Sequence, residues 1–551
     1  MALAVSSAPD LAGDADRGEA WHAAGDYSLV IAASRLPVDE IDGPDGSAEW
    51  RPSPGGLVTA LRPVMRAADG VWIGWSGAAG DAPEPFDIAG MRLVGVGLSA
   101  AEVRDYYEGF CNATLWPLYH DVIAPPVFDR SWWDAYVAVN SRYARTAAQQ
   151  AASGGTVWVH DYQLQLVPGM LRKLRADVRI GFFLHVPFPG YEIFAQLPWR
   201  RQIIEGLLGA DLVGFQRRGD AANFLRACRR AAGLVTRGSL VRVPPAAPGG
   251  TPAAQGMARE DPQAREDPQA REDPQAREDP QAREDPQARP GREVLAGTFP
   301  ISIDSSDFAE LAGQESVRAR ARDIREALGN PATVLLGIDR LDYTKGILHR
   351  LTAYGELLSE GRLDPAEAVL VLVASPSRER VEQYRLLRDE VEVAVGRING
   401  EHAELGNPPI HYLHQTYPQE ELAALYLAAD VMLVTSLRDG MNLVAKEYVA
   451  SRMDETGALV LSEFTGAADE LGSAFLVNPH DIEGLKQAIM HAVRVSPGEA
   501  RRRMRSMRRQ VREHDVAHWA AAFTDALARA PATASPSRRP LPPRGLPVSA
   551  Q

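Results

Sequence analysis

Cysteine is almost absent from this chain, and so are long apolar segments. Only Cys111 and Cys228 occur among its 551 residues, which is too few for a disulfide framework or a cysteine metal site. No apolar run approaches the roughly 18 residues that a membrane span requires, and the first residues lack the basic region of a secretion signal. We therefore expect a cytoplasmic protein with no membrane partner.

An excess of positive charge and the common cofactor fingerprints are also lacking. Asp and Glu number 72 against 59 Lys and Arg, so the formal net charge is −13, which argues against a nucleic-acid partner. The chain has no Gly-x-Gly-x-x-Gly segment, no Walker pattern and no aspartate cluster at the spacing of metal ligands. We therefore expect no resident metal ion and no bound cofactor.

Alternating strand-like and helix-like segments make up most of the chain. Hydrophobic residues account for 45%, enough for more than one core, and this alternation predicts α/β domains with parallel, doubly wound sheets. We expect an N-terminal domain over 27–303 and a C-terminal domain over 304–530, with the last helix packing back on the first domain. Residues 1–26 lack periodicity and residues 531–551 are rich in proline, so we predict a disordered leader and a disordered tail. The predicted strands are 27–33, 71–73, 156–159, 180–184 and 212–215, then 333–338, 368–374, 410–413, 431–434 and 458–462, and the clearest helix is 131–150.

A repeated hexapeptide interrupts the first domain. Arg-Glu-Asp-Pro-Gln-Ala occurs five times without a break over 259–288, inside a Pro, Gly and Ala rich region of about 244–292. A proline every six residues prevents a continuous helix, and the repeat offers no large apolar side chain for burial. We predict an exposed, disordered insertion, and we assign no chemistry to it.

The segment 437–449 carries the clearest sign of a ligand site. An apolar strand at 431–434 runs into a polar turn at Gly440 and then into a helix, so free amide groups and the helix dipole face the turn. Such a corner holds a phosphate or a developing negative charge. Glu447 lies eight residues after Asp439, about two helical turns, and its carboxylate can accept hydrogen bonds from the paired hydroxyls of a ribose or a hexose.

Three cations follow other strands of the second domain. Arg340 and Lys345 come directly after the strand 333–338, and Arg378 follows the strand 368–374. Ligands of open α/β sheets bind at this edge, where an Arg guanidinium suits bidentate contact with phosphate and Lys supplies a point charge. Arg340 and Lys345 can therefore neutralise a pyrophosphate, while Arg378 can hold a second phosphate.

An arginine, a glycine pair and several aromatic rings mark the start of the first domain. Arg35 ends the first strand, and Gly55-Gly56 stands before an expected helix, although a lone glycine pair is more often only a turn. Trp75, Tyr107 and Trp116 lie in polar, glycine-rich surroundings. Sugars stack their apolar faces on such rings, but burial in a core is the commoner role for any one of them.

Two polar motifs follow adjacent strands of the first domain. His160-Asp161 comes after the strand 156–159, and His185 comes after the strand 180–184. A single His or Asp at such a position is as often structural as functional, but two motifs at one sheet edge favour a site. Together with the cations of the second domain, they suit a nucleotide-sugar donor and a phosphorylated acceptor in a cleft between two domains.

Taken together, these segments resemble the trehalose-6-phosphate synthase family. They stand in the family's order, and the resemblance covers about 27–527 apart from the repeat insertion. It implies a GT-B fold, with two Rossmann-like domains and the active site between them. It also implies retaining transfer of glucose from a nucleoside diphosphate glucose to glucose 6-phosphate, which would give α,α-trehalose 6-phosphate. The matching segments are Gly-Trp75-Ser-Gly, Tyr-Tyr107, Leu-Trp116-Pro, Trp-Val-His-Asp161-Tyr, Leu-His185-Val-Pro-Phe-Pro, Arg340-Leu-Asp-Tyr-Thr-Lys345-Gly, Gly-Arg-Ile-Asn-Gly400 and Arg-Asp439-Gly-Met-Asn-Leu-Val-Ala-Lys-Glu447-Tyr.

The resemblance also implies a role for particular residues. Arg340 and Lys345 would stabilise the departing diphosphate, and Asp439 and His185 would hold the donor glucose. Attack would come from the front face with the donor phosphate as proton acceptor, so no residue is expected to act as the catalytic base and no metal is required. The implied acceptor site comprises Arg35, Trp75, Tyr107, Trp116, Asp161 and Arg378, and the implied donor site comprises Gly55, Gly56, His185, Arg340, Lys345, Tyr417, Asp439, Gly440, Met441, Asn442, Leu443, Val444 and Glu447.

Two other functions stay open. A sister glucosyltransferase would use another phosphorylated acceptor, such as glycerol 3-phosphate or a cyclitol phosphate, and a catalytically silent regulatory subunit would keep the fold but lose the donor contacts. All the implied contact residues are present, although the family's usual Ser-Asn-Arg is Ala33-Ser34-Arg35 here. The sequence leaves open whether the donor carries UDP, GDP or ADP, with UDP favoured by the resemblance, and whether the protein is a homo-oligomer.

Overall fold

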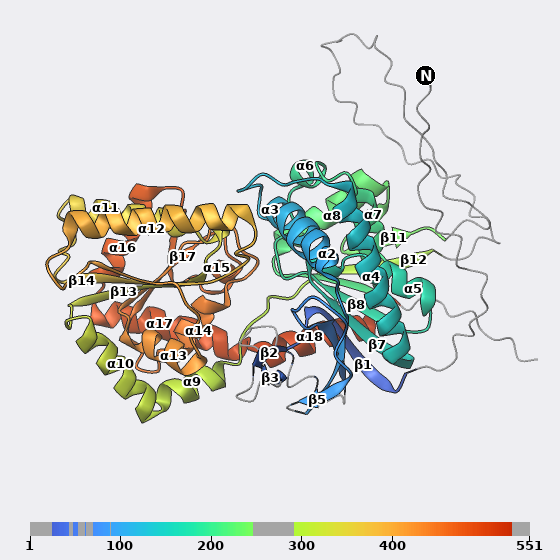
Figure 1. Ribbon diagram of the computed structural model, residues 1–551, viewed down its shortest axis with the longest axis horizontal. Coiled ribbons are helices and arrows are strands. Elements are labelled where there is room, and N and C mark those ends of the chain that lie inside the picture. Colours follow the sequence, from blue (N-terminus) through green and yellow to red (C-terminus); the bar gives the residue numbers. More distant parts are fainter. Residues whose placement is uncertain are drawn as a thin grey trace, which may run out of the picture.

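The computed structural model describes residues 25–42, 48–52, 61, 65, 70–88, 90–245 and 291–531. Figure 1 shows this part of the chain as two α/β units side by side, each built on its own sheet. The α/β fold class predicted from the sequence is therefore confirmed. The predictions for the leader up to residue 24, the hexapeptide repeats, Gly55-Gly56 and the tail beyond residue 531 lie outside the described residues.

The first sheet has ten strands in the order β10-β11-β12-β9-β8-β7-β1-β4-β6-β5. Its central strands, from β12 to β6, all pair in parallel. Both edges are antiparallel, since β10 pairs with β11, β11 with β12 and β5 with β6 in that sense, a detail that the sequence pattern did not indicate. β2 and β3 form a separate hairpin. The strands are β1 (Tyr27–Arg35), β2 (Val38–Asp42), β3 (Ala48–Pro52), β4 (Val71–Trp75), β5 (Phe86–Ile88), β6 (Met91–Gly95), β7 (Ala151–His160), β8 (Arg179–Phe183), β9 (Leu212–Phe215), β10 (Val235–Arg237), β11 (Leu240–Val243) and β12 (Arg292–Thr298).

The second sheet has six strands, all parallel, in the order β15-β14-β13-β16-β17-β18. Its middle strands are buried along almost their whole length, as expected when helices cover both faces of a parallel sheet. Figure 1 shows α11, α12 and α16 on one face and α10, α13, α14 and α17 on the other. The strands are β13 (Thr333–Arg340), β14 (Ala368–Ser375), β15 (Ile410–Leu413), β16 (Val431–Val434), β17 (Ala458–Ser462) and β18 (Phe475–Val477).

Local capping signals set where several helices begin. The predicted helix at 131–150 is α4 (Arg130–Gln150), and its cap Asp129 accepts a hydrogen bond from the Ser131 amide at 2.7 Å. No helix among the described residues is long and apolar enough to cross a membrane. The other helices are α2 (Ala100–Glu102), η1 (Val103–Leu115), α3 (Trp116–Tyr119), η2 (Tyr162–Leu164), α5 (Val167–Leu174), α6 (Tyr191–Phe194), α7 (Arg200–Leu207), α8 (Arg218–Ala232), α9 (Ser305–Gly313), α10 (Glu315–Ala327), η3 (Tyr343–Lys345), α11 (Ile347–Ser359), α12 (Glu382–His402), α13 (Gln419–Ala428), α14 (Leu443–Ser451), α15 (Ala467–Glu470), α16 (Ile482–Val493), α17 (Pro497–Glu513) and α18 (Val516–Arg529).

The carboxyl ends of the two parallel sheets meet across a cleft. Arg340, at the end of β13, lies over the Trp116 ring with 5.4 Å between its Cζ and the ring centroid. Gly440, after β16, lies so close to the carbonyl oxygen of His185 that a Cβ atom there would be 2.0 Å from it, so only glycine fits at this position. Open α/β sheets bind their ligands at this edge, and the functional site is therefore expected in the cleft.

The last helix crosses back to the first sheet. Phe523 of α18 stacks on Trp158 of β7 with 4.4 Å between ring centroids and 5° between planes, and Trp519 lies 5.1 Å from the same ring. Arg179, at the start of β8, donates a hydrogen bond to the Leu527 carbonyl at 2.7 Å. These contacts join the end of the chain to the core of the first domain.

The repeat insertion is attached at the strand ends that point away from the cleft. It connects β11 to β12, which are antiparallel neighbours with Val243 opposite Arg292. Arg292, which the sequence analysis placed within the insertion, is the first residue of β12. Because β12 runs parallel to β9, its Thr298 end lies at the cleft and its Arg292 end lies at the opposite edge of the sheet. Both attachment points are therefore remote from the site.

We expect Phe523→Ala to lower the free energy of unfolding by about 3–5 kcal/mol, because the ring is fully buried and its loss leaves a cavity. Denaturant unfolding of the purified variant measures this loss. Phe128→Ala is the control, since Phe128 is 39% exposed and its truncation should cost less than about 1 kcal/mol. Equal losses in the two variants would contradict a structural role for α18.

Candidate active site

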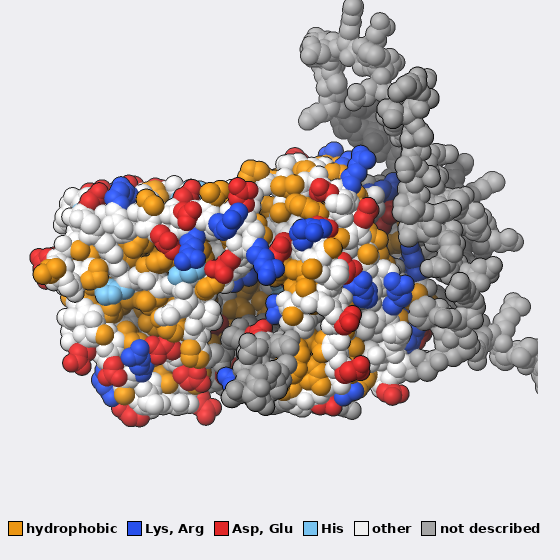
Figure 2. Space-filling view, viewed as in Figure 1, with side chains coloured by type: hydrophobic (Ala, Val, Ile, Leu, Met, Phe, Trp, Pro, Cys, Tyr) orange, Lys and Arg blue, Asp and Glu red, His pale blue; other side chains and the backbone are white. Residues whose placement is uncertain are grey.

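Site residues from both domains gather in the cleft in two adjoining groups. Figure 2 shows the surface hollowed between the two units, with Lys and Arg side chains close to the hollow. One group surrounds Arg378 and Trp116, and we call it the acceptor-side group. The other surrounds Lys345 and Asp439, and we call it the donor-side group.

Arg378 is the centre of the acceptor-side group. It follows β14, its side chain is only 7% exposed, and its Cζ lies 3.8 Å from the centroid of the Trp116 ring. Its guanidinium pairs with Asp342 at 3.4 Å and donates hydrogen bonds to the Tyr162 hydroxyl at 3.2 Å and to Tyr384. Burial opposes ionisation of Asp342, but Arg378, Arg340 and Lys345 lower its pKa to about 2. Asp342 therefore balances the charge of a buried arginine.

Arg35 approaches the same pocket from the first sheet. Its Cζ lies 5.2 Å from the Trp75 ring centroid, and its guanidinium contacts Asp39 at 3.1 Å and the Ser76 carbonyl at 3.2 Å. A Cβ on Gly77 would lie 2.2 Å from this guanidinium, and Gly77 also has a φ of 103°, a value that favours glycine. The turn after β4 therefore leaves space for Arg35 beside the pocket.

The acceptor-side pocket has a volume of about 380 Å³. That size suits a ligand with the dimensions of a sugar phosphate. Four of the six residues predicted for the acceptor site line it, and the predicted donor residue Arg340 lines it as well. The lining includes Arg35, Trp75, Tyr107, Glu108, Asn112, Arg340, Arg378 and Arg380.

Asp161 and His185 connect the two groups. The His185 amide donates to Asp161 Oδ1 at 3.1 Å, and Asp161 has a φ of 73°, a strained value for this residue that recurs at functional sites. Burial raises the pKa of Asp161 to about 6 and lowers that of His185 to about 3. His160 Nδ1 lies 3.1 Å from His185 Nε2. Since desolvation also lowers the pKa of His160, this is a hydrogen bond between two neutral rings.

Lys345 and Asp439 form the ion pair of the donor-side group. Lys345 Nζ lies 2.5 Å from Asp439 Oδ2, and the two side chains are 11% and 15% exposed. Ser436 and Asn442 also donate to this carboxylate, at 3.4 and 3.3 Å. Burial opposes ionisation of Asp439, but the Lys345 ammonium holds its pKa below the usual value. The pair is therefore charged and ready to exchange partners with an anionic ligand.

The turn after Asp439 presents a helix start to the cleft. Gly440 and Met441 are buried, and Asn442 adopts a φ of 83° as the cap of α14. Its side chain accepts a hydrogen bond from the Ala445 amide at 3.0 Å, which satisfies one of the four amides that a helix start leaves unpaired. The first turn of the helix contains the half-buried Leu443 and Val444. The structure thus has the strand, turn and helix start from which the sequence analysis predicted an anion site.

Two predicted donor residues lie further along the same side. Glu447 accepts a hydrogen bond from the Tyr426 hydroxyl at 2.8 Å, and burial raises its pKa. Tyr417 accepts a hydrogen bond from Gln415 and packs against the core of the second domain. Gly55 and Gly56 cannot be placed relative to these residues, because they lie outside the described part of the chain.

Sequence reasoning missed several residues of the site. Asp342 stands inside the Arg340–Lys345 motif, but nothing in its spacing indicated that it would pair with Arg378. Tyr384 and Asn112 lie on α12 and η1 and belong to none of the motifs that the sequence analysis singled out. Arg438 lies 3.2 Å from Asp121 and 3.5 Å from Asp220, so it links the donor-side turn to the first domain. Only long-range contacts identify these partners.

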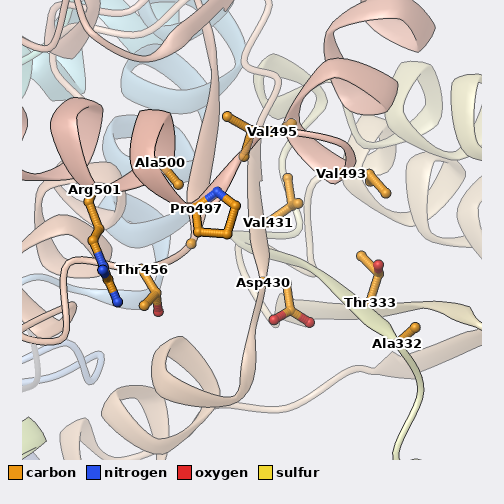
Figure 3. Close-up of a pocket in the computed structure, with 12 residues that line it drawn as sticks. Ala332, Thr333, Asp430, Val431, Thr456, Val493, Val495, Pro497, Ala500 and Arg501 are labelled. Atoms are coloured by element: carbon orange, nitrogen blue, oxygen red, sulfur yellow. The ribbon is translucent and has the colours of Figure 1, made fainter.

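A second pocket, of about 290 Å³, lies at the opposite edge of the second sheet. Figure 3 shows Thr333 and Val431, which begin β13 and β16, facing it together with Arg501 of α17. It contains none of the residues predicted for the site. In the described ranges, no group of three or more His, Cys, Asp and Glu side chains could hold a metal ion.

Two Rossmann-like sheets whose carboxyl ends face each other across a cleft define the GT-B class of glycosyltransferases, and the cations and aromatic rings in this cleft agree with that class. Residues 27–529 match glycosyltransferase family 20. The chain belongs to this family and is a glycosyltransferase.

Relatives of known name are similar over nearly the whole chain. Identity is 55% over 507 residues with the trehalose-6-phosphate synthase of Mycolicibacterium gilvum (strain PYR-GCK), covering 91% of this chain and 93% of the relative. A UDP-forming α,α-trehalose-phosphate synthase from Burkholderia xenovorans, solved in complex with glucose-6-phosphate, is 31% identical with a TM-score of 0.75, covering 91% and 99% of the two chains. A trehalose-6-phosphate protein from E. coli bound with UDP-2-fluoro glucose is 31% identical with a TM-score of 0.76 and the same coverage. The family resemblance noted in the sequence is confirmed.

His120 gives a prediction for the pH dependence of stability. It is 2% exposed and bonds the Trp116 carbonyl through Nδ1 at 2.8 Å, and burial lowers its pKa to about 4 despite this hydrogen bond. The unfolded chain, with a His pKa of about 6.5, binds a proton between pH 6.5 and 4 that the folded protein does not. The free energy of unfolding should therefore fall as pH drops through this range, by up to about 1.4 kcal/mol per pH unit from this group.

Denaturant unfolding of His120→Gln at pH 7 and pH 5 tests this expectation. The variant should lose less stability on acidification than the parent protein does, because the titrating group is gone. His518→Gln, at an exposed position, is the control for the His-to-Gln exchange itself. A pH dependence in His120→Gln identical to that of the parent would show that His120 is not neutral in the folded protein.

Proposed function

We propose that this enzyme transfers glucose from a nucleoside diphosphate glucose to glucose 6-phosphate, with retention, and releases α,α-trehalose 6-phosphate. The observation that carries the proposal is the meeting of a basic, aromatic pocket of about 380 Å³ with a helix-start anion site in one cleft. Similar enzymes are solved with glucose-6-phosphate and with UDP-2-fluoro glucose. The two groups of site residues thus match two substrates of those kinds.

In the proposed acceptor complex, cations hold the phosphate and aromatic rings border the sugar. Arg35 and Arg378 enter the pocket from opposite domains, and guanidinium groups suit phosphate oxygens. Trp75, Tyr107 and Trp116 supply apolar surface for the hexose ring. Burial raises the pKa of Asp161 to about 6, so it is mostly ionised at neutral pH and can accept hydrogen bonds from sugar hydroxyls.

In the proposed donor complex, the diphosphate takes over the cations of the donor-side group. Lys345 is paired with Asp439 at 2.5 Å, so an incoming phosphate would compete with that carboxylate for the ammonium. Freed from Lys345, Asp439 could accept a hydrogen bond from the donor sugar beside His185. We propose that the amides at the start of α14 bind the diphosphate and that the Glu447 carboxylate accepts hydrogen bonds from the ribose.

The chemical step depends on stabilising the negative charge that develops on the leaving diphosphate. We propose that Arg340, Lys345 and the helix start supply this stabilisation in place of a metal ion. Arg340 also lines the acceptor pocket, so in this proposal its guanidinium would lie between the two substrates, beside the bond that breaks. Front-face attack, with the donor phosphate taking the proton of the acceptor hydroxyl, requires no protein base.

The nucleotide, the compartment and the alternatives remain part of the proposal. UDP is the favoured nucleotide, because a similar protein is bound with UDP-2-fluoro glucose. A cytoplasmic location fits the two cysteines, which are both buried and free of disulfides. A sister enzyme with another phosphorylated acceptor, or a catalytically silent subunit, would fit the same fold, and the assay below separates them. A homo-oligomer is compatible with each of these functions.

Nucleotide release by the purified protein tests the reaction. UDP-, GDP- and ADP-glucose are each supplied with and without glucose 6-phosphate, in EDTA and then with added Mg²⁺. We expect release that depends on glucose 6-phosphate, is fastest with UDP-glucose and does not need the metal. Release with glycerol 3-phosphate or a cyclitol phosphate alone would indicate the sister enzyme, and no release with any pair would indicate a silent subunit.

Arg340→Ala should lower turnover at saturating donor by on the order of 100-fold or more, because the charge on the leaving diphosphate would lose its guanidinium partner. Steady-state kinetics with both substrates saturating measure this loss. Arg92→Ala is the matched control. Arg92 lies on β6, next to the edge strand β5 of the first sheet, and pairs with Asp87 at 2.8 Å. Its removal should leave turnover unchanged. A near-normal rate in Arg340→Ala would exclude this role.

A further inference from the structure

Asn112 lies in the acceptor-side pocket with an unused hydrogen-bond donor. We propose that Asn112 Nδ2 donates a hydrogen bond to an oxygen of the phosphorylated acceptor and so helps to select that substrate. This inference rests on the proposed function, because it names an additional residue for the acceptor site. Neither the sequence motifs nor the residues implied by the family resemblance included Asn112.

The burial of Asn112 makes its unpaired donor significant. The side chain is 1% exposed and lines the pocket, yet Nδ2 has no hydrogen-bond partner among the described residues. A buried polar group without a partner costs the free energy of its desolvation, so such groups are rare in native structures. A ligand oxygen in the pocket would provide the missing acceptor.

A chain of hydrogen bonds sets the orientation of the Asn112 amide. Arg378 Nη2 can only donate, and it donates to the Tyr162 hydroxyl at 3.2 Å. The Tyr162 proton is then free to point the other way, and it is donated to Asn112 Oδ1 at 2.8 Å. With Oδ1 occupied as an acceptor, Nδ2 is the amide atom that is left without a partner in the described part of the chain. The chain also links Asn112 to the predicted phosphate-binding arginine.

The helix that carries Asn112 has an unusual form that brings it to the pocket. η1 is a π-helix, and its i→i+5 hydrogen bonds place residues four or five apart on one face. Val103, Tyr107 and Asn112 follow this spacing, and all three line the pocket. In an α-helix the step of five residues from Tyr107 to Asn112 would make about 1.4 turns. One of the two side chains would then point away from the pocket. The π-helix therefore presents both polar groups to the same ligand.

Two other donors near Asn112 are unpaired in the same way. Arg35 Nε and Trp116 Nε1 are buried without partners among the described residues, and both residues belong to the predicted acceptor site. Arg35 lines the acceptor-side pocket with Asn112, so two unused donors, from β1 and η1, belong to the lining of one pocket.

Asn112→Asp tests the donor without changing the shape of the side chain. Aspartate keeps an oxygen for the Tyr162 hydroxyl but replaces the Nδ2 donor with an acceptor that repels phosphate and cannot bond a lone pair. We expect KM for glucose 6-phosphate to rise by about 10- to 100-fold, with KM for the nucleotide sugar changed by less than about twofold. Calorimetric binding of glucose 6-phosphate to the protein without donor should weaken by the same factor.

Asn399→Asp is the matched control. Asn399 also lies on a helix, α12, and its Nδ2 donates a hydrogen bond to the Ile410 carbonyl at 3.0 Å, but it does not line the acceptor-side pocket. This variant should leave both KM values unchanged. Asn112→Ser, which keeps a shorter hydroxyl donor, should give a smaller rise in KM than Asn112→Asp, and thermal unfolding of all three variants reports whether each one folds.

The outcomes separate this inference from the proposed function. If the parent protein binds and uses glucose 6-phosphate but Asn112→Asp does so equally well, or loses affinity for both substrates alike, the role of Asn112 is wrong and the function stands. If the parent protein neither binds nor uses glucose 6-phosphate, both fall. Inhibition by inorganic phosphate shows which part of the acceptor Asn112 contacts. A larger inhibition constant in Asn112→Asp means that Nδ2 bonds a phosphoryl oxygen, and an unchanged constant means that it bonds a sugar hydroxyl.

Discussion

The contact of Arg378 with Trp116 is the interaction on which the rest of the site depends. Arg378 follows β14 of the second sheet, whereas Trp116 and its neighbour Tyr162 belong to the first domain, so the acceptor-side pocket exists only while the two domains are together. A buried guanidinium needs a carboxylate partner, because an uncompensated buried charge costs several kcal/mol. Asp342 meets that need from the η3 motif, which also carries Lys345 toward the donor side. One arginine thereby connects the acceptor-side group with the donor-side group.

The donor side is tied to the first domain by a different set of contacts. Arg438, next to Asp439, reaches Asp121 and the buried Asp220, and Gly440 lies against the His185 carbonyl. Asp439 and His185 belong to different domains, so these contacts decide whether both can reach one sugar. A displacement of about 1 Å at such a site is enough to cost much of the rate. The interdomain contacts are therefore part of the site itself.

Several strained backbone positions lie in this cleft. Asp121, Asp161, Arg378 and Asn442 all have positive φ values, each of which costs about 1–3 kcal/mol in an L-residue. The packed sheets and the stacked rings of α18 hold these positions in place, because the apolar surface that they bury contributes far more free energy of folding than the strain costs. The π-helix η1 belongs to the same pattern, because its less favourable hydrogen bonding is retained where it presents Tyr107 and Asn112 to the pocket.

The sequence by itself determined the α/β class and ten of the strands, because hydrophobic periodicity is a signal that acts within a few residues. It did not indicate β2, β3, β5, β6, β10, β11, β12 or β18. The predicted strands at 212–215, 410–413, 431–434 and 458–462 have the same bounds as β9, β15, β16 and β17. The tertiary structure alone decided the pairing of Arg378 with Asp342, the link from Arg438 to Asp220 and the unused donor of Asn112. Those features depend on contacts between segments far apart in the chain, and local spacing carries no information about which distant side chains will meet when two sheets close on each other.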